Sequence, residues 1–138
     1  TVGLDPEERA RFRGLLSELG GTRIVLLSTH IVPDVEAAAE RVAVLDRGRL
    51  RADGSPGELL AAVEGGVWEL TVEGDRLPEL RSRCPVVSTA HRPEGVHVRV
   101  LADGPPTADA VAVAPTLEDA YLWLMREGGA GDREPVAA

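Results

Sequence analysis

The chain has 138 residues, enough for one ordinary domain or two small ones with a buried core. Hydrophobic residues make up 43% of it and charged residues 28%, which is typical of a folded globular protein. A formal net charge of −8 disfavours proteins that grip nucleic acid or anionic lipid by charge, and no apolar run is long enough to insert across a bilayer. We expect no signal peptide and a cytoplasmic protein.

The first predicted element is a helix that begins at Asp5-Pro6 and ends at Gly20-Gly21. Asp5 can cap this helix, proline suits its first position, and Glu8 can complete a capping box. Apolar residues at helical spacing predict its inward face: Phe12, Leu15, Leu16 and Leu19. Asp5 therefore has a complete structural explanation as a helix cap.

The run from Ile24 to Leu27 predicts a short strand, because four consecutive branched apolar residues are typical of a strand buried on both faces in a parallel sheet. It ends in Ser28-Thr29-His30. Ligands of open parallel sheets bind beyond the carboxyl ends of the strands, so these hydroxyls and the imidazole are candidates for ligand contact. The alternative is an ordinary loop in which His30 caps the next helix or lies in solvent.

The next segments predict a helix from Pro33, a hairpin of strands 42–45 and 49–52, and a helix from Ser55 to Val63. Asp34 falls in the first turn of the earlier helix, where the helix dipole favours acids. Gly65-Gly66 is the predicted domain boundary.

The second half predicts a small α+β unit with an antiparallel sheet. We expect strands and helices in this order: strand 68–72, helix 75–83, strands 86–90, 96–100 and 110–114, and a helix from Pro115-Thr116. Thr116 and Asp119 form a predicted capping pair. His91 and His97 are expected to be surface or cross-strand residues, and Cys84, the single cysteine, a plain thiol without a disulfide. Residues 128–138 are expected to be a disordered tail.

Three motifs in order give the chain a family resemblance. Gly3-Leu4-Asp5-Pro6 looks like a D-loop, Ser28-Thr29-His30 looks like a switch histidine, and Val42 to Leu50 looks like the terminal hairpin of an ABC transporter nucleotide-binding subunit. Residues 115–122 resemble part of the extra C-terminal domain of drug-export or ABC-2-type ATPases. The resemblance implies an α/β fragment of an ABC nucleotide-binding domain in residues 1–65 and an α+β accessory domain in 66–127.

The same resemblance implies roles for single residues. His30 would contact the terminal phosphate of ATP, and Gly3, Leu4 and Asp5 would lie at a dimer interface near ATP. ATP and Mg would be the cofactors of the intact parent protein. A membrane permease subunit and a second copy of the ATPase would be its partners, which places it at the inner face of the cell membrane.

Other motifs of this family are missing. The sequence has no lysine, no Gly-rich phosphate loop, no signature motif and no catalytic glutamate, and no Cys/His cluster has the spacing of a metal site. We therefore expect a fragment that binds no cofactor and has no activity alone. Ile31 stands where many relatives carry an acid, so the hydrogen bonding of His30 is expected to differ from theirs.

Two other functions remain as alternatives. A hydrolase could use Ser28, His30 and Asp5, but the Gly-x-Ser-x-Gly turn of such enzymes is missing. The chain could also be a self-associating or regulatory module without catalysis, in which residues 66–138 bind another copy, a permease or a small ligand.

Overall fold

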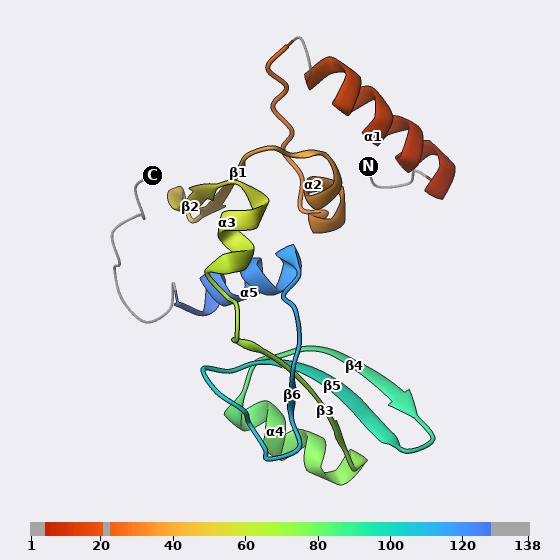
Figure 1. Ribbon diagram of the computed structural model, residues 1–138, viewed down its shortest axis with the longest axis vertical. Helices are drawn as coiled ribbons and strands as arrows, with labels where there is room; N and C mark the ends of the chain where they lie inside the picture. Colours follow the sequence, from red (N-terminus) through yellow and green to blue (C-terminus); the bar gives the residue numbers. More distant parts are fainter. Residues whose placement is uncertain (1–4, 21–22, 128–138) are drawn as a thin grey trace.

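The computed structural model describes residues 5–20 and 23–127, which form an α/β fold with two antiparallel sheets (Figure 1). The elements in chain order are α1 (Pro6–Gly20), α2 (Val32–Ala38), β1 (Val42–Asp46), β2 (Arg49–Gly54), α3 (Pro56–Ala61), β3 (Val67–Val72), a 3₁₀ turn (Gly74–Arg76), α4 (Leu77–Arg83), β4 (Val86–Arg92), β5 (Gly95–Leu101), β6 (Val111–Ala112) and α5 (Leu117–Glu127).

The smaller sheet is the hairpin of β1 and β2, as predicted. Its turn residues Arg47 and Gly48 both have positive φ, 49° and 75°, which is the backbone geometry that a two-residue hairpin turn requires. The larger sheet has the order β4-β5-β3-β6 with every neighbouring pair antiparallel. The predicted antiparallel sheet is confirmed.

One face of the larger sheet carries the first core. The alternating residues Leu70 of β3 and Val98 of β5 are cross-strand partners, and both are buried. Helix α4 covers this face with Leu80, and the alternating apolar pattern of the sequence therefore marks the buried side correctly. The buried members of this core are Leu70, Leu80, Val96, Val98 and Val100.

The second core lies between helices. Its buried members are Leu59 and Val63, which belong to α3 and the turn after it, and Leu117 and Ala120 of α5. Figure 1 shows α5 beside α3, and these two helices are in contact. The last helix thus packs against elements that precede the larger sheet in sequence.

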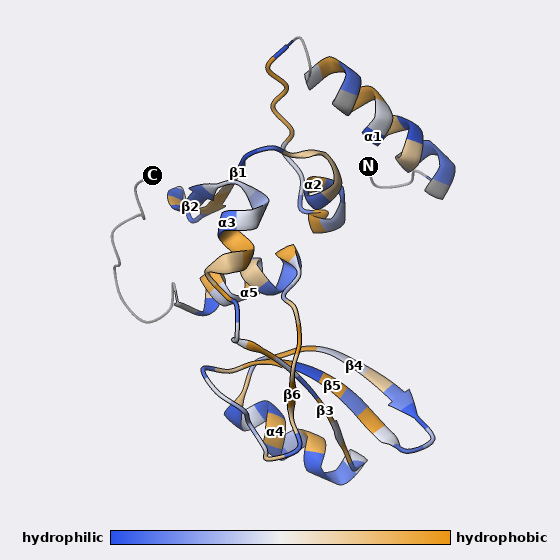
Figure 2. Cartoon of the chain, in the orientation of Figure 1, coloured by the Kyte–Doolittle hydropathy of each residue, from blue (hydrophilic) through white to orange (hydrophobic). Residues whose placement is uncertain are grey.

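The predicted strand from Ile24 to Leu27 is wrong. This stretch is irregular and pairs with no strand of the described chain, and the side chains of Ile24 and Leu26 are 102% and 95% exposed. Figure 2 shows it as an apolar connection between α1 and α2. A strand exists only where a neighbour completes its ladder of hydrogen bonds, and an apolar sequence supplies no such neighbour by itself.

Three smaller differences follow from long-range packing. β6 pairs only through Val111 and Ala112, so it is shorter than the expected strand 110–114. The expected helix 75–83 starts with a 3₁₀ turn. Leu15, expected on the inward face of α1, is 53% exposed.

Candidate functional site around His30

His30 is the last residue but one before α2, on the irregular segment that leaves α1. The Thr29 hydroxyl accepts a hydrogen bond from the backbone N–H of Ile31 at 3.0 Å, which turns the backbone around His30. The His30 side chain is exposed. Among the described residues none forms a hydrogen bond or ion pair with the imidazole, so its ring nitrogens face solvent and can contact a ligand.

Asp5 lies at the N-terminus of α1 and forms the predicted capping box. Its carboxylate accepts the backbone N–H of Glu8 at 2.8 Å, and the Glu8 carboxylate accepts the backbone N–H of Asp5 at 3.2 Å. Gly3 and Leu4, the other two predicted site residues, lie outside the described residues.

Asp34 lies in the first turn of α2, as predicted. Its burial, with 3% exposure, was not predicted. Its Oδ1 lies 3.9 Å from Nε of Arg13 on α1, while Oδ2 and that Nε have no hydrogen-bond partner. This loose pair joins the helix that begins after Asp5 to the helix that begins after His30.

The arrangement does not assemble a hydrolytic triad. The Asp5 carboxylate is engaged by the backbone of Glu8, and within the described chain Ser28 has no hydrogen bond to His30. A nucleophilic serine needs a base within hydrogen-bonding reach. The geometry offers one free imidazole near a helix start.

A second polar cluster ties α5 to the larger sheet. Arg99 of β5 donates to both carboxylate oxygens of Asp119, at 3.1 and 2.7 Å, to Glu69 at 2.7 Å and to the carbonyl of Ala114 at 2.8 Å. Asp119 also accepts the backbone N–H and the hydroxyl of Thr116, at 2.7 and 2.8 Å. The predicted pairing of Thr116 with Asp119 is thus confirmed, and the arginine is an addition that the sequence did not reveal.

Charge and burial act in opposite directions on Asp119. Burial by itself raises the pKa of this carboxyl, but the hydrogen bonds from Arg99 and Thr116 outweigh burial and hold the pKa below its ordinary value of 3.8. The same carboxylate raises the pKa of the Arg99 guanidinium. The cluster is therefore charged over the physiological range and fixes the start of α5.

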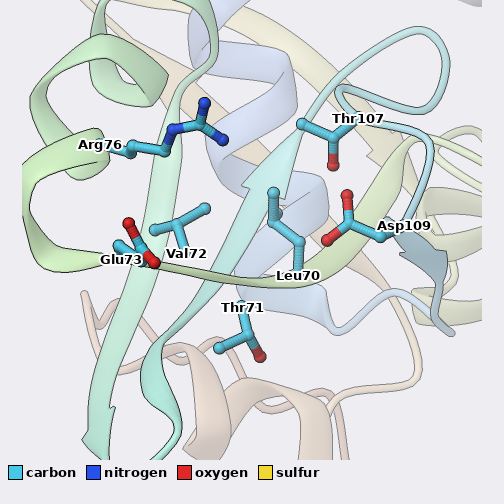
Figure 3. A pocket seen from close by; sticks show the side chains of 7 residues that line it. All are labelled: Leu70, Thr71, Val72, Glu73, Arg76, Thr107 and Asp109. Atoms are coloured by element: carbon cyan, nitrogen blue, oxygen red, sulfur yellow. The ribbon is translucent and has the colours of Figure 1, made fainter.

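A shallow hollow of about 420 Å³ lies at the end of β3. Its lining includes Leu70, Glu73, Arg76, Thr107 and Asp109. Figure 3 shows the side chains of Thr107 and Asp109 facing one another across from Arg76. One arginine beside two acids gives this hollow no net preference for an anion. His30 is therefore the stronger candidate for contact with a phosphate.

Two general features complete the description. Within residues 5–20 and 23–127, no group of three or more His, Cys, Asp or Glu side chains is placed to hold a metal ion. In the same ranges, no helix combines the length and the apolar character needed to cross a bilayer.

Comparison with known proteins shows a consistent set of relatives, although no family model matches the sequence. The chain is 32% identical over 139 residues to an uncharacterised ABC transporter ATP-binding protein of Synechocystis, covering 92% of this chain and 38% of that protein. It is 32% identical over 146 residues to a daunorubicin resistance ATP-binding protein of Streptomyces coeruleorubidus, covering 90% of this chain and 45% of the relative.

A third relative matches a shorter part of the chain. A Nod factor export ATP-binding protein of Ralstonia nicotianae is 39% identical over 83 residues, covering 59% of this chain and 26% of the relative. In each of these comparisons the chain spans less than half the length of the relative.

Proposed function

From the premise that this chain belongs to the ABC transporter ATP-binding proteins, we propose that it is part of the ATP-hydrolysing subunit that powers an exporter. The chain spans 38% of the length of one relative, so the activity proposed here is that of a longer subunit. Relatives named for daunorubicin resistance and for Nod factor export support export as the direction of transport.

The role proposed for His30 is contact with the terminal phosphate of ATP. The observation that carries it is an exposed imidazole without a partner in the described chain, at the end of a segment just before a helix. A neutral imidazole can donate from one nitrogen to a phosphate oxygen, where negative charge develops during phosphoryl transfer. The turn at Thr29 and Ile31 fixes the backbone on either side of this donor.

The role proposed for Gly3, Leu4 and Asp5 is that of a D-loop, which contacts a second copy of the ATPase near the bound nucleotide. Asp5 is exposed at the start of α1, so its outer surface is available to another chain. Its carboxylate also caps the helix. Both roles can coexist, because a carboxylate oxygen accepts more than one hydrogen bond.

The proposed setting is the inner face of the cell membrane, with a permease subunit and a second ATPase copy as partners. ATP and Mg serve the complete subunit. The 138 residues contain neither a phosphate loop nor any lysine, so by themselves they are proposed to bind no nucleotide.

The domain division is also a proposal. Residues 1–65 would be the C-terminal part of the nucleotide-binding domain, and 66–127 the accessory α+β domain of drug-export or ABC-2-type ATPases. The predicted tail 128–138 lies outside the described residues. The larger sheet with α4 has its own core, which supports this division. Helix α5 packs with α3 across the proposed boundary and would be the bridge between the two parts.

The test of the His30 role uses the complete subunit. His30→Ala should lower ATP turnover by about 10²–10³-fold, because one preorganised donor to transition-state charge is lost. Nucleotide binding should stay nearly unchanged. His91→Ala, which removes another exposed histidine on β4, is the matched control and should leave turnover unaltered. Turnover of His30→Ala equal to that of His91→Ala would remove His30 from the mechanism.

A second test uses the 138-residue chain alone. Calorimetric titration with Mg-ATP should give no heat of binding, because most backbone donors to nucleotide phosphates come from a phosphate loop. A micromolar dissociation constant would contradict the proposal.

A non-catalytic role has one observation in its favour. The exposed apolar side chains of Ile24 and Leu26 lie on an irregular stretch that pairs with no strand of the described chain, which favours association with a second copy. Light scattering at tens of micromolar should then show self-association that Leu26→Ser abolishes. A strictly monomeric chain would exclude this role.

A further inference from the structure

Helix α2 lies between the two ends of the described chain. It contacts α1 on one side and α5 on the other, and Figure 1 shows it in the space between them. Val32, its first residue, is two positions after His30. Whatever fixes α2 therefore also fixes the backbone that carries the imidazole.

Helix α2 is not stable without tertiary contacts. It has seven residues, and its N-cap position, Ile31, makes no side-chain capping hydrogen bond. Isolated helices of this length are unstable in water, so the helix depends on tertiary contacts. The charged pair between α2 and α1 is loose, because the Arg13–Asp34 distance is 3.9 Å and buried polar atoms of the pair have no hydrogen-bond partner.

The apolar side chains of α2 contact the second core. Val32 and Val35 of α2 pack against the buried cluster that includes Leu117 and Ala120 of α5. These two residues are 3% and 1% exposed, and they share the cluster with Leu59 and Val63. The apolar face of α2 therefore packs against a cluster to which α5 contributes Leu117 and Ala120.

Helix α5 is in turn fixed by the larger sheet. Arg99 of β5 donates hydrogen bonds to Asp119 in the first turn of α5, and Asp119 is fully buried. Further along α5, Trp123 lies so close to Gly66 that a Cβ added there would come within 2.7 Å of the indole ring. Both contacts lie at the same end of the sheet, where the start of β3 pairs with the end of β5, and they hold α5 at its first turn and again at Trp123.

We propose that α5 is a positioning element for His30, so that the larger sheet sets the placement of the imidazole through α5 and α2. This inference rests on the function proposed for His30, since a placed imidazole matters only if it meets a ligand. Leu117 and Ala120 are positioning residues in this scheme and touch no substrate.

The test compares two leucine truncations in the 138-residue chain. Leu117→Ala removes packing at the second core, and Leu80→Ala removes the same atoms from the first core, where the leucine is 6% exposed. Hydrogen exchange is followed at the backbone N–H groups of Asp34, Val35 and Ala39, which bond to carbonyls at 3.1, 3.4 and 2.9 Å. Leu117→Ala should speed their exchange about tenfold or more by local opening, and Leu80→Ala should not.

Two further variants keep the result decisive. Leu117→Met conserves volume and should restore slow exchange. If Leu117→Ala also exposes the larger sheet, Leu124→Ala, at a half-buried position of the same cluster, gives a milder truncation with the same expected pattern. The inference would be overturned if α2 exchanged at the same rate in Leu80→Ala as in the α5 variants. It would also be overturned if the N–H groups of α2 were unprotected in the unaltered chain.

In the complete subunit, Leu117→Ala should lower kcat with little change in KM for ATP, and Leu117→Met should recover it. Exchange is measured without nucleotide, so its outcome does not depend on the proposed function. If His30→Ala leaves turnover intact while exchange of α2 still follows α5, the phosphate role fails and the packing link stands. If His30→Ala lowers turnover but hydrogen exchange of α2 is unchanged in the α5 variants, only the proposed positioning of His30 by α5 is contradicted.

Discussion

Two apolar runs of this chain end in opposite environments. Ile24 to Leu27 is irregular and exposed at its first three residues. Val96, Val98 and Val100, which alternate with polar residues on β5, belong to a strand with neighbours on both sides. Both runs are rich in branched apolar residues. What separates them is the neighbours, because β3 and β4 complete the hydrogen bonds of β5 while the described chain offers none to the earlier run. Whether an apolar stretch forms a strand therefore depends on a neighbouring strand as well as on its own residues.

The comparison extends to residues 5–20 and 23–31, here called the N-terminal arm, against residues 32–127, here called the packed part. The same residue type should matter much less in the arm. Three of the following predictions pair a residue of the packed part with its counterpart in the arm, and one follows Asp119 in acid.

The largest effect is expected for the aspartates of the two capping boxes. Asp119→Ala should lower the free energy of unfolding by about 3 kcal/mol or more, because Arg99 loses a buried charged partner. Asp5→Ala removes only an exposed cap and should lower it by about 1 kcal/mol. Chemical denaturation at pH 7 measures both. Equal losses of unfolding free energy in the two variants would show that burial adds nothing to the contribution of the capping aspartate.

A leucine pair isolates packing from charge. Leu101 is 1% exposed and Leu26 is 95% exposed. Leu101→Ala should lower the free energy of unfolding by about 2–5 kcal/mol through lost contacts and a cavity. Leu26→Ala should change it by less than about 0.5 kcal/mol. A large loss for Leu26→Ala in the monomer would show that the exposed run packs in solution.

Acid should weaken the packed part through Asp119. The pKa of this carboxyl is lower in the folded protein than its ordinary value of 3.8. The stabilisation is therefore complete above that value and is lost as the pH falls below it toward the folded pKa. Thermal unfolding from pH 6 down to pH 2 should show this loss, and Asp119→Asn should flatten the curve in the acid range. An unchanged acid slope in Asp119→Asn would assign the loss to other carboxyl groups.

The smallest effect is expected for a serine pair. Ser55 caps α3, with the backbone N–H of Glu58 donating to its hydroxyl at 3.3 Å, and the Glu58 carboxylate accepts the Ser55 N–H at 2.7 Å. Ser55→Ala should lower the free energy of unfolding by about 1 kcal/mol. Ser28→Ala in the arm should have no measurable effect on stability, because its side chain is exposed.

Local features of this protein were determined by the sequence alone. The capping boxes at Asp5 and Thr116, the hairpin turn at Arg47-Gly48 and the alternating inward residues of β3 and β5 all follow from neighbours within a few positions. Such contacts form wherever the segment adopts its preferred backbone, so the residues that make them can be identified without the fold.

Tertiary structure alone decided the rest. Three features join positions 20 or more residues apart in the sequence: the pair of Asp34 with Arg13, the pair of Asp119 with Arg99, and the packing of α5 on α2 and α3. The same holds for the run at Ile24, whose strand character depended on a neighbour. A charge is buried and a strand completed only where the fold brings a partner, and that depends on long-range packing that no local pattern encodes.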